Sequence, residues 1–331
     1  MRIGYLGFGA WGCCLASLLA QQGHLVSAWS HNAQLVAHFR HHRRHPRLSH
    51  PLPEGLTVTD RLEEAIADAE LLVESVTCGG LRTTLQRLRG YLLKPIPFVL
   101  TSKGIEQDSC LTLPEVVIET LGEPMRQHIA LLSGPSFAEE VMRGLPTSVV
   151  ASAYDSLLIG QVCRLFTTKS FRVYPNQDLR GVAYGGAMKN VIAIACGFAE
   201  GLLLGYGCSA TLMTRGLHEM AKLAIASGSR PETLWGLSGM GDLCMTCSSP
   251  MSRNFRFGHL LATGYTFGQA LEEIGMVVEG AYTCRSLLQL SEQRSVAMPI
   301  AETVYKILYE ELQPLRAVEL LMQRTIKEEH L

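Results

Sequence analysis

The sequence has no excess of charge of either sign, because 29 Lys and Arg residues nearly balance 30 Asp and Glu residues for a formal net charge of −1. This balance argues against nucleic acid as the main partner, since nucleic acids are bound mainly by clustered positive charge. Long apolar runs are also missing. The longest, residues 191–199, falls far short of the ~20 residues that a membrane helix needs. We therefore expect no membrane insertion and a cytoplasmic protein.

The cysteines lack the spacing of a disulfide framework. Ten are present, Cys13 and Cys14 are adjacent, and most others lie in apolar helical contexts. Cys244 and Cys247 form a Cys-x-x-Cys pair, but a zinc site would need a second such pair or a His-x-x-x-His pair at a suitable spacing from it along the chain. The sequence offers neither, so we predict that no metal is bound and that these cysteines are buried small hydrophobic residues.

The most informative stretch is the first one, where a short apolar strand ends in Gly7-x-Gly9-x-x-Gly12 and a helical pattern follows. Strand, glycine turn and helix are the context in which this spacing indicates dinucleotide binding. Gly7 allows a tight turn, Gly9 leaves room for a pyrophosphate, and Gly12 lets helix and strand pack closely. The alternative is a glycine turn without a ligand, and we favour the cofactor.

Strands and helices alternate over the first half of the chain. Beyond the first strand, we predict strands at residues 25–29, 56–59, 71–76, 97–101, 129–133, 147–151 and 171–174. Such alternation predicts an α/β fold, a Rossmann-type doubly wound and mostly parallel sheet whose ligands bind at the carboxyl ends of the strands. From about residue 177 the pattern is helical. We therefore predict a dinucleotide-binding domain at 1–176 and an all-helical substrate and catalytic domain at 177–331.

The second strand ends in Ser30, His31 and Asn32, without the acidic residue that usually binds the ribose hydroxyls of NAD. A 2′-phosphate is therefore admissible, and we expect NADPH or NADH as cofactor. A basic, histidine-rich segment at residues 38–47 follows. We interpret it mainly as a solvated cationic loop; a contact from one of its arginines to a 2′-phosphate and weak nucleic-acid binding are the alternatives.

A lysine in an apolar helix is the strongest signal in the second half. Lys189 lies within residues 181–196, which are apolar nearly all round, and two glycines precede it by one turn. The glycines indicate either room for a ligand or close packing of another helix. Burial lowers the pKa of a lysine toward the range in which it can exchange a proton at neutral pH. Asp242, expected in a glycine-flanked loop, is the candidate carboxylate partner.

Two helix starts carry polar residues. Ser252 is predicted to cap a helix running to about residue 262, which places Arg253 and Asn254 in its first turn, where they suit an anionic phosphate. Ser136 and Glu139 fit a capping box after the strand at 129–133.

Taken together, these motifs show that the chain resembles the bacterial NAD(P)-dependent sn-glycerol-3-phosphate dehydrogenase family from end to end. Beyond the glycine turn with Trp11, the resemblance is carried by Ser102-Lys103-Gly104-Ile105-Glu106, Ser133-Gly134-Pro135-Ser136-Phe137-Ala138, Gly185-Gly186-Ala187-x-Lys189-Asn190-Val191, Thr214-Arg215-Gly216, Gly241-Asp242-Leu243-x-x-Thr246-Cys247, Ser252-Arg253-Asn254 and Val277-Val278-Glu279-Gly280. It implies NAD(P)H-dependent, reversible reduction of dihydroxyacetone phosphate to sn-glycerol 3-phosphate for phospholipid synthesis, and a homodimer.

The resemblance also implies site residues. Catalysis falls to Lys189 as proton donor and acceptor, with Lys103 and Asp242 beside it. The substrate contacts would be Lys103, Gly134, Ser136, Lys189, Asp242, Ser252, Arg253 and Asn254. The dinucleotide contacts would be Gly7, Gly9, Trp11, Gly12, His31, Lys103, Ala138, Arg253, Val277 and Glu279.

The chain departs from the family pattern at Thr77-Cys78, where Pro-Ser is usual, and at Gly207 and Ser209, where an asparagine and a basic residue are usual. Two alternative functions stay open. A 3-hydroxy-acid or ketopantoate-type reductase would share the architecture, although the phosphate-binding turn argues against it. A regulator that binds NADPH without catalysis is the second, and Lys189 and Asp242 argue against that one.

Overall fold

The computed structural model describes residues 1–48, 50–326 and 328–329. The chain divides into two compact units, of which the first comprises Met1–Ser102 and Leu113–Leu179 and the second Lys103–Thr112 and Arg180–Leu331. The division of function at residues 176 and 177 stays a prediction. The alternation of elements did not indicate that Lys103–Thr112 belongs to the helical unit.

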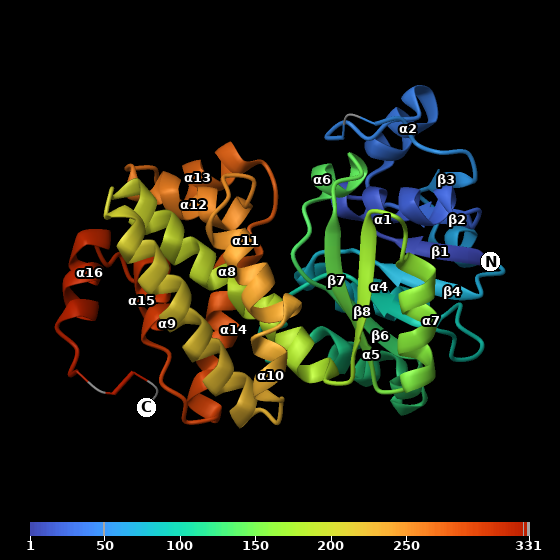
Figure 1. The fold of residues 1–331 in the computed structure, drawn as a ribbon. Helices are drawn as coiled ribbons and strands as arrows, with labels where there is room; N and C mark the ends of the chain where they lie inside the picture. The colour runs from blue at the N-terminus through green and yellow to red at the C-terminus, as the bar shows by residue number, and fades with distance from the viewer. Residues whose placement is uncertain (49, 327, 330–331) are drawn as a thin grey trace. The chain divides into compact units, whose positions relative to one another are not determined.

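The first unit is built on one sheet of eight strands in the order β3-β2-β1-β4-β5-β6-β7-β8 (Figure 1). All neighbouring strands are parallel except β6 and β7, which are antiparallel. This confirms the predicted Rossmann-type, mostly parallel sheet. The strands are β1 (Arg2–Leu6), β2 (Leu25–Trp29), β3 (Leu56–Thr59), β4 (Leu71–Glu74), β5 (Phe98–Leu100), β6 (Ile129–Ser133), β7 (Thr147–Ala153) and β8 (Phe171–Asn176).

Helices connect these strands and bury their apolar faces against the sheet. Residues of α1, α2 and α7 join strand residues in one core cluster, as expected for a parallel sheet whose strands are covered by helices. The helices are α1 (Ala10–Gln21), α2 (Ala33–His42), α3 (Leu62–Ile66), α4 (Cys78–Arg89), α5 (Leu113–Leu121), α6 (Ala138–Met142) and α7 (Ser156–Phe166).

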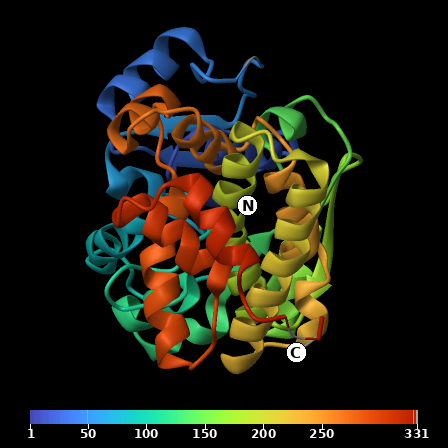
Figure 2. The ribbon, with the colours of Figure 1, turned by 90° about the vertical axis from the view of Figure 1, so that its left-hand side faces the viewer.

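The second unit is helical, as predicted, and Figure 2 turns its α16 toward the viewer. Its core gathers residues from α8, α9, α14 and α15, together with Ile105 and Cys110 of the segment Lys103–Thr112. The helices are α8 (Leu179–Gly201), α9 (Gly205–Ala226), α10 (Pro231–Leu234), α11 (Asp242–Cys247), α12 (Arg253–Ala262), α13 (Phe267–Ile274), α14 (Glu279–Gln293), α15 (Pro299–Tyr309) and α16 (Pro314–Met322).

Helix α8 is long and apolar enough to cross a membrane by length and composition alone. Its most apolar window is, however, entirely buried inside the structure, which is the arrangement of a core helix. The predicted buried helix around Lys189 is therefore confirmed, with Lys189 only 5% exposed.

Candidate functional site

The glycine turn after β1 shows what each glycine does. Gly7 has a φ of +95°, and a Cβ there would lie 2.8 Å from the backbone of Ser75. At Gly12 a Cβ would lie 2.0 Å from the carbonyl oxygen of Gly7. At Gly9 a Cβ would meet no atom within 4 Å. Gly7 and Gly12 are thus required by the protein's own packing, whereas Gly9 keeps space open in front of the turn.

That open space lies at the N-terminus of α1, which carries no side-chain cap and no acidic residue in its first turn. Backbone N–H groups at such an end attract anions, and the helix dipole adds to the effect. The residues present therefore fit a dinucleotide pyrophosphate at Gly9, while Trp11 lies in the same first turn.

The end of β2 is shaped by short polar contacts rather than by an acid. The Ser30 hydroxyl accepts a hydrogen bond from the Asn32 amide at 3.2 Å, and Asn32 caps α2 through Leu35 N–H at 3.0 Å. His31 between them is exposed. A carboxylate is thus absent from residues 30–32, and a 2′-phosphate meets no negative side chain there.

The basic segment that follows is more ordered than a solvated loop. Arg43 ends α2 and donates hydrogen bonds to the carbonyls of Pro53 and Leu56 at 3.0 and 3.4 Å. His45 is 3% exposed and packs edge-on against Phe8 of the glycine turn, and burial lowers its pKa to about 4. The interpretation as a solvated cationic loop is therefore wrong for His45, which is buried. Arg43 is exposed, as that interpretation expects, although its hydrogen bonds tie it to the residues before β3 and to Leu56.

The capping box predicted at Ser136 does not form. Helix α6 begins at Ala138, its N-cap is Phe137, and no side chain caps it. The Ser136 hydroxyl instead donates to the carbonyl of Gly134 at 3.2 Å. Gly134 has a φ of +148°, and a Cβ there would lie 2.8 Å from Val149 Cα. Close backbone packing, rather than capping, therefore sets this turn.

A buried carboxyl that the sequence analysis passed over ties β4 to β5. Glu74 is fully buried, and it accepts hydrogen bonds from the Ser102 hydroxyl at 2.7 Å and from Val76 N–H at 2.6 Å. Burial raises the pKa of Glu74 to about 8. Its position inside an apolar strand pattern hid it, because only the sheet topology brings β5 and Ser102 to the end of β4.

In the helical unit, two lysines meet one carboxylate. Lys189 Nζ lies 2.5 Å from Asp242 Oδ1, and Lys103 Nζ lies 2.6 Å from Asp242 Oδ2. Asp242 is fully buried, and the side chains of Lys189 and Lys103 are 7% and 19% exposed. The predicted partnership of Lys189, Lys103 and Asp242 is thus present in one cluster with a net charge of +1.

Burial lowers the pKa of Lys189 to about 8, with Asp242 opposing and Lys103 reinforcing the shift. The pKa of this amine is therefore close to neutral pH, which is where a general acid or base works best. Among the residues that the structure describes, this amine donates hydrogen bonds to Asp242 and Thr246. An ammonium has three N–H donors, so one remains for a ligand oxygen.

The structure adds Thr246 to the cluster and changes the setting of Asp242. Thr246 Oγ1 accepts from Lys189 at 2.8 Å and donates to the backbone carbonyl of Asp242 at 2.6 Å. Asp242 begins α11 after a π-helical turn, Leu237–Gly241, rather than lying in a loop. The spacing of four residues between Asp242 and Thr246 was the available signal, since it places both on one helix face.

Of the two glycines before Lys189, Gly185 is required by close packing. A Cβ at Gly185 would lie 2.6 Å from the carbonyl oxygen of Ser238 in the π-helical turn. Close approach of this turn, which carries Asp242 at its end, therefore requires the glycine. Of the two alternatives, close packing is the one found at Gly185.

The predicted capping of α12 is confirmed, because Ser252 Oγ accepts from Phe255 N–H at 3.2 Å and the helix runs from Arg253 to Ala262. Asn254 is buried; it donates to Asn190 Oδ1 and accepts from Gly280 N–H, both at 2.9 Å. Arg253 donates to the carbonyl of Val277 at 2.7 Å. This turn is thus joined to α8 beside Lys189, to Val277 before α14, and to the first turn of α14, which begins at Glu279.

The predicted site residues therefore divide between the units. The first unit holds Gly7, Gly9, Trp11, Gly12, His31, Gly134, Ser136 and Ala138, and the second holds Lys103, Lys189, Asp242, Ser252, Arg253, Asn254, Val277 and Glu279.

Both members of the Cys-x-x-Cys pair are free thiols; Cys247 is buried, but Cys244 is exposed. The prediction of burial is wrong for Cys244.

Comparison with known proteins decides the family. The model described as NAD-dependent glycerol-3-phosphate dehydrogenase N-terminus matches residues 2–158, and the corresponding C-terminus model matches residues 178–319. The chain belongs to this family. Members of it with curated names include the glycerol-3-phosphate dehydrogenase [NAD(P)+] of Protochlamydia amoebophila, 57% identical over 331 residues, which are 100% of this chain and 99% of the relative. The enzyme of the same name from Chlamydia pneumoniae is 52% identical over 331 residues, again 100% of this chain and 99% of the relative.

Among solved structures, glycerol-3-phosphate dehydrogenase from Coxiella burnetii is similar to this family member with a TM-score of 0.94 and 35% identity, covering 98% of this chain and 99% of the other. A ketopantoate reductase from Ralstonia eutropha reaches a TM-score of 0.63 at 15% identity, which shows a shared fold alone. The resemblance recognised in the sequence is therefore confirmed, together with the oxidoreductase class and the NAD(P) cofactor that the family implies.

Proposed function

We propose that this chain catalyses the reversible, NAD(P)H-dependent reduction of dihydroxyacetone phosphate to sn-glycerol 3-phosphate. The observation that carries the proposal is the buried cluster in which Lys189 and Lys103 share the two oxygens of Asp242. Its net positive charge suits an alkoxide that develops from a ketone, and its lysine can exchange a proton near neutral pH. Family membership supplies the substrate.

When bound, the nicotinamide supplies or accepts the hydride, and we assign its dinucleotide to the domain at residues 1–176, with Gly9 against the pyrophosphate. In the domain at 177–331, the spare N–H of Lys189 donates to the substrate carbonyl oxygen and its proton passes to the developing alkoxide. Asp242 and Thr246 fix the direction of the amine through their hydrogen bonds. Lys103 adds positive potential at the same oxygen.

We assign the substrate phosphate to the turn of Ser252, Arg253 and Asn254. The guanidinium suits a phosphate because its N–H groups match the oxygens in pairs. Asn254 fixes the turn through Asn190 and Gly280, so the phosphate and the carbonyl are held on elements joined to each other. Such positioning lowers the barrier by removing motion before reaction.

The remaining assignments concern individual contacts and the assembly. Gly134, Ser136, Trp11, His31, Ala138, Val277 and Glu279 stay proposed contacts to substrate or cofactor. We also propose a cytoplasmic homodimer without membrane insertion that supplies glycerol phosphate for phospholipid synthesis. The support for these points is the likeness to the bacterial relatives.

The test is the loss of reduced nicotinamide absorbance with dihydroxyacetone phosphate, using NADPH and NADH in parallel. We expect turnover in the wild type, loss of about a thousandfold or more in Lys189→Ala, since both acid catalysis and charge stabilisation are removed, and no loss in Lys169→Ala, an exposed lysine. Arg253→Ala should raise KM for the substrate far more than Arg294→Ala. Absence of turnover in a folded wild type that binds NADPH would contradict the proposal.

A further inference from the structure

A cavity lies within the helical unit and is lined by residues outside the lysine cluster. It has a volume of about 690 Å³ and is formed by α8, α9, α15 and α16 with the residues that follow α16. Its described lining residues include none of Lys103, Lys189 and Asp242. The volume falls within the roughly 300–1,000 Å³ that small-molecule sites span.

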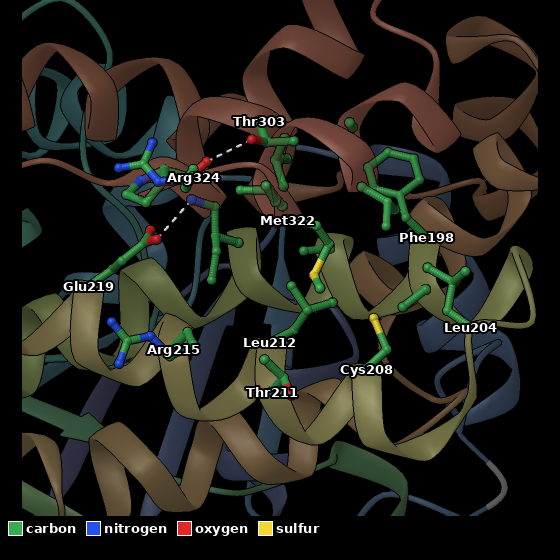
Figure 3. Close-up of a pocket in the computed structure, with 18 of the residues that line it drawn as sticks. Phe198, Leu204, Cys208, Thr211, Leu212, Arg215, Glu219, Thr303, Met322 and Arg324 are labelled. Atoms are coloured by element: carbon green, nitrogen blue, oxygen red, sulfur yellow. Dashed lines mark hydrogen bonds between the residues drawn. The ribbon is translucent and has the colours of Figure 1, made fainter. Parts of the chain in front are cut away.

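The cavity is polarised along its length. Figure 3 shows Arg215, Glu219 and Arg324 gathered at one end and Phe198 and Leu204 at the other. Apolar residues from all four helices, Ala and Pro as well as Leu, Ile, Val, Met and Phe, make up most of the wall. A ligand that matches it needs an apolar body and a polar head at one end.

The polar end carries a surplus of positive charge. Arg215 and Arg324 lie there (Figure 3), and Lys222, three residues after Glu219 on α9, also lines the cavity. Glu219 is the sole acid among the lining residues that the structure describes. The Glu219 carboxyl is directed to backbone donors at the start of α15, with Ile300 N–H at 2.8 Å and the N–H of the next residue at 3.3 Å. Burial also raises the pKa of Glu219 to about 7, so near neutral pH its charge is only partly developed.

Arg215 is held by a backbone carbonyl. Its Nη1 donates to the backbone carbonyl of Glu329 at 2.6 Å, and a carbonyl partner fixes the side chain without neutralising it. Two arginines and a lysine are thus set against one partly protonated carboxyl. This surplus favours an anionic head group over a neutral or cationic one.

We propose that this cavity binds a single-chain amphiphile with an anionic head, a fatty-acyl anion, whose chain lies along Phe198, Leu212 and Met322 and whose head lies at Arg215, Lys222 and Arg324. Burial of successive methylene groups supplies the binding free energy, and the cations set the orientation. The proposal does not rest on the dehydrogenase activity, because none of its residues belongs to the lysine cluster.

Calorimetric titration of the whole protein with dodecanoate tests the proposal, beside dodecyltrimethylammonium as the probe of equal chain and opposite charge. We expect saturable binding of one dodecanoate per chain and binding of the cationic probe weaker by about tenfold or more, the scale of a charge-assisted contact. Equal binding of the two probes, or no saturable binding of dodecanoate, would overturn it.

Matched variants on α16 locate the site. Leu321 lines the cavity and Leu320 does not, so Leu321→Trp should weaken dodecanoate binding by about tenfold or more while Leu320→Trp leaves it unchanged. Arg324→Glu should weaken it likewise, and Arg316→Glu, which is exposed and outside the cavity, should not. If the controls are equally affected, the site lies elsewhere.

The cavity could instead be covered by a second copy of this chain, and sedimentation analysis of the same variants, which measures the oligomeric state, distinguishes this case from ligand binding. A dimer that Leu321→Trp dissociates, with no dodecanoate binding in the wild type, would make the cavity an interface and overturn the proposal. Folding of each variant is checked by its unfolding transition. Dodecanoate binding is read without turnover, so its failure is distinguishable from a failure of the proposed reaction.

Discussion

Replacing Asp242 by asparagine keeps the shape of the cluster and removes its negative charge. Lys189 Nζ and Lys103 Nζ would then face each other across a neutral amide, because both lie within 2.6 Å of the carboxylate in the native protein. Asp242 raises the pKa of Lys189 and Lys103 lowers it, against a larger lowering by burial. Asp242→Asn therefore leaves two effects that lower this pKa and removes the main one that opposes them.

The magnitude follows from the geometry. Unit charges about 4 Å apart attract by ~4 kcal/mol at an effective dielectric constant of ~20. Since one pKa unit is ~1.36 kcal/mol, loss of the carboxylate lowers the pKa of Lys189 by up to ~3 units from its native value of about 8. Removing one partner of a buried ion pair also costs roughly 3–5 kcal/mol of stability, so the variant is compared at a temperature well below its unfolding.

The assay is kcat/KM for dihydroxyacetone phosphate reduction as a function of pH, which reports the pKa values of the free enzyme. Reduction needs protonated Lys189, so the wild-type rate should fall as pH rises through about 8, and in Asp242→Asn this fall should move to lower pH by about two to three units. Thr246→Val, which removes a 2.8 Å hydrogen bond without a charge, should move it far less. A fall at the same pH in wild type and Asp242→Asn would refute the assignment of Lys189 as the proton donor.

Two further predictions concern the first unit. Gly9→Ala should fold with nearly native stability, because its Cβ meets no atom within 4 Å, but should bind NADPH at least about tenfold more weakly by obstructing the pyrophosphate; Gly12→Ala should instead unfold at much lower urea concentration, since its Cβ would lie 2.0 Å from a carbonyl. Nucleotide titration and urea unfolding of the pair check this, and equal stabilities would contradict it. Glu74 has a folded pKa of about 8, above its ordinary 4.5, so native protein binds the extra proton and unfolding free energy should fall as pH rises from about 4.5 to about 8, by at most ~5 kcal/mol. Glu74→Gln should reduce this fall, measured by urea unfolding across that range, but not abolish it, because Glu219, whose pKa burial raises to about 7, contributes a fall of its own. An unchanged pH dependence would show that Glu74 does not contribute to it.

Much of the fold was predictable because it depends on local pattern. The alternation of apolar strands with helices predicted the parallel sheet, and the apolar surroundings of Lys189 predicted a buried helix. The Gly7, Gly9 and Gly12 spacing predicted a turn whose packing requirements the structure bears out. These features follow from neighbours in sequence, which periodicity and turn chemistry report directly.

What the sequence did not show depends on distant segments. Glu74 acquires its partners only when β5 brings Ser102 to the end of β4. The Ser136 capping box failed because the close approach of Gly134 to Val149 determines that turn. The placement of Lys103 beside Asp242 came only from the family resemblance, since no local rule relates residues so far apart.

The assignment of Lys103–Thr112 to the helical unit bears on the order of synthesis. Lys103 leaves the ribosome 139 residues before Asp242, and the chain that follows it first returns to the sheet at Leu113–Leu179. The segment must therefore wait, exposed, until most of the helical unit has been made. A gene fragment that begins after Leu179 would encode Lys189 and Asp242 but omit Lys103, Ile105 and Cys110 from the helical core. Exchange of the helical half between relatives would thus pair each Asp242 with another protein's Lys103.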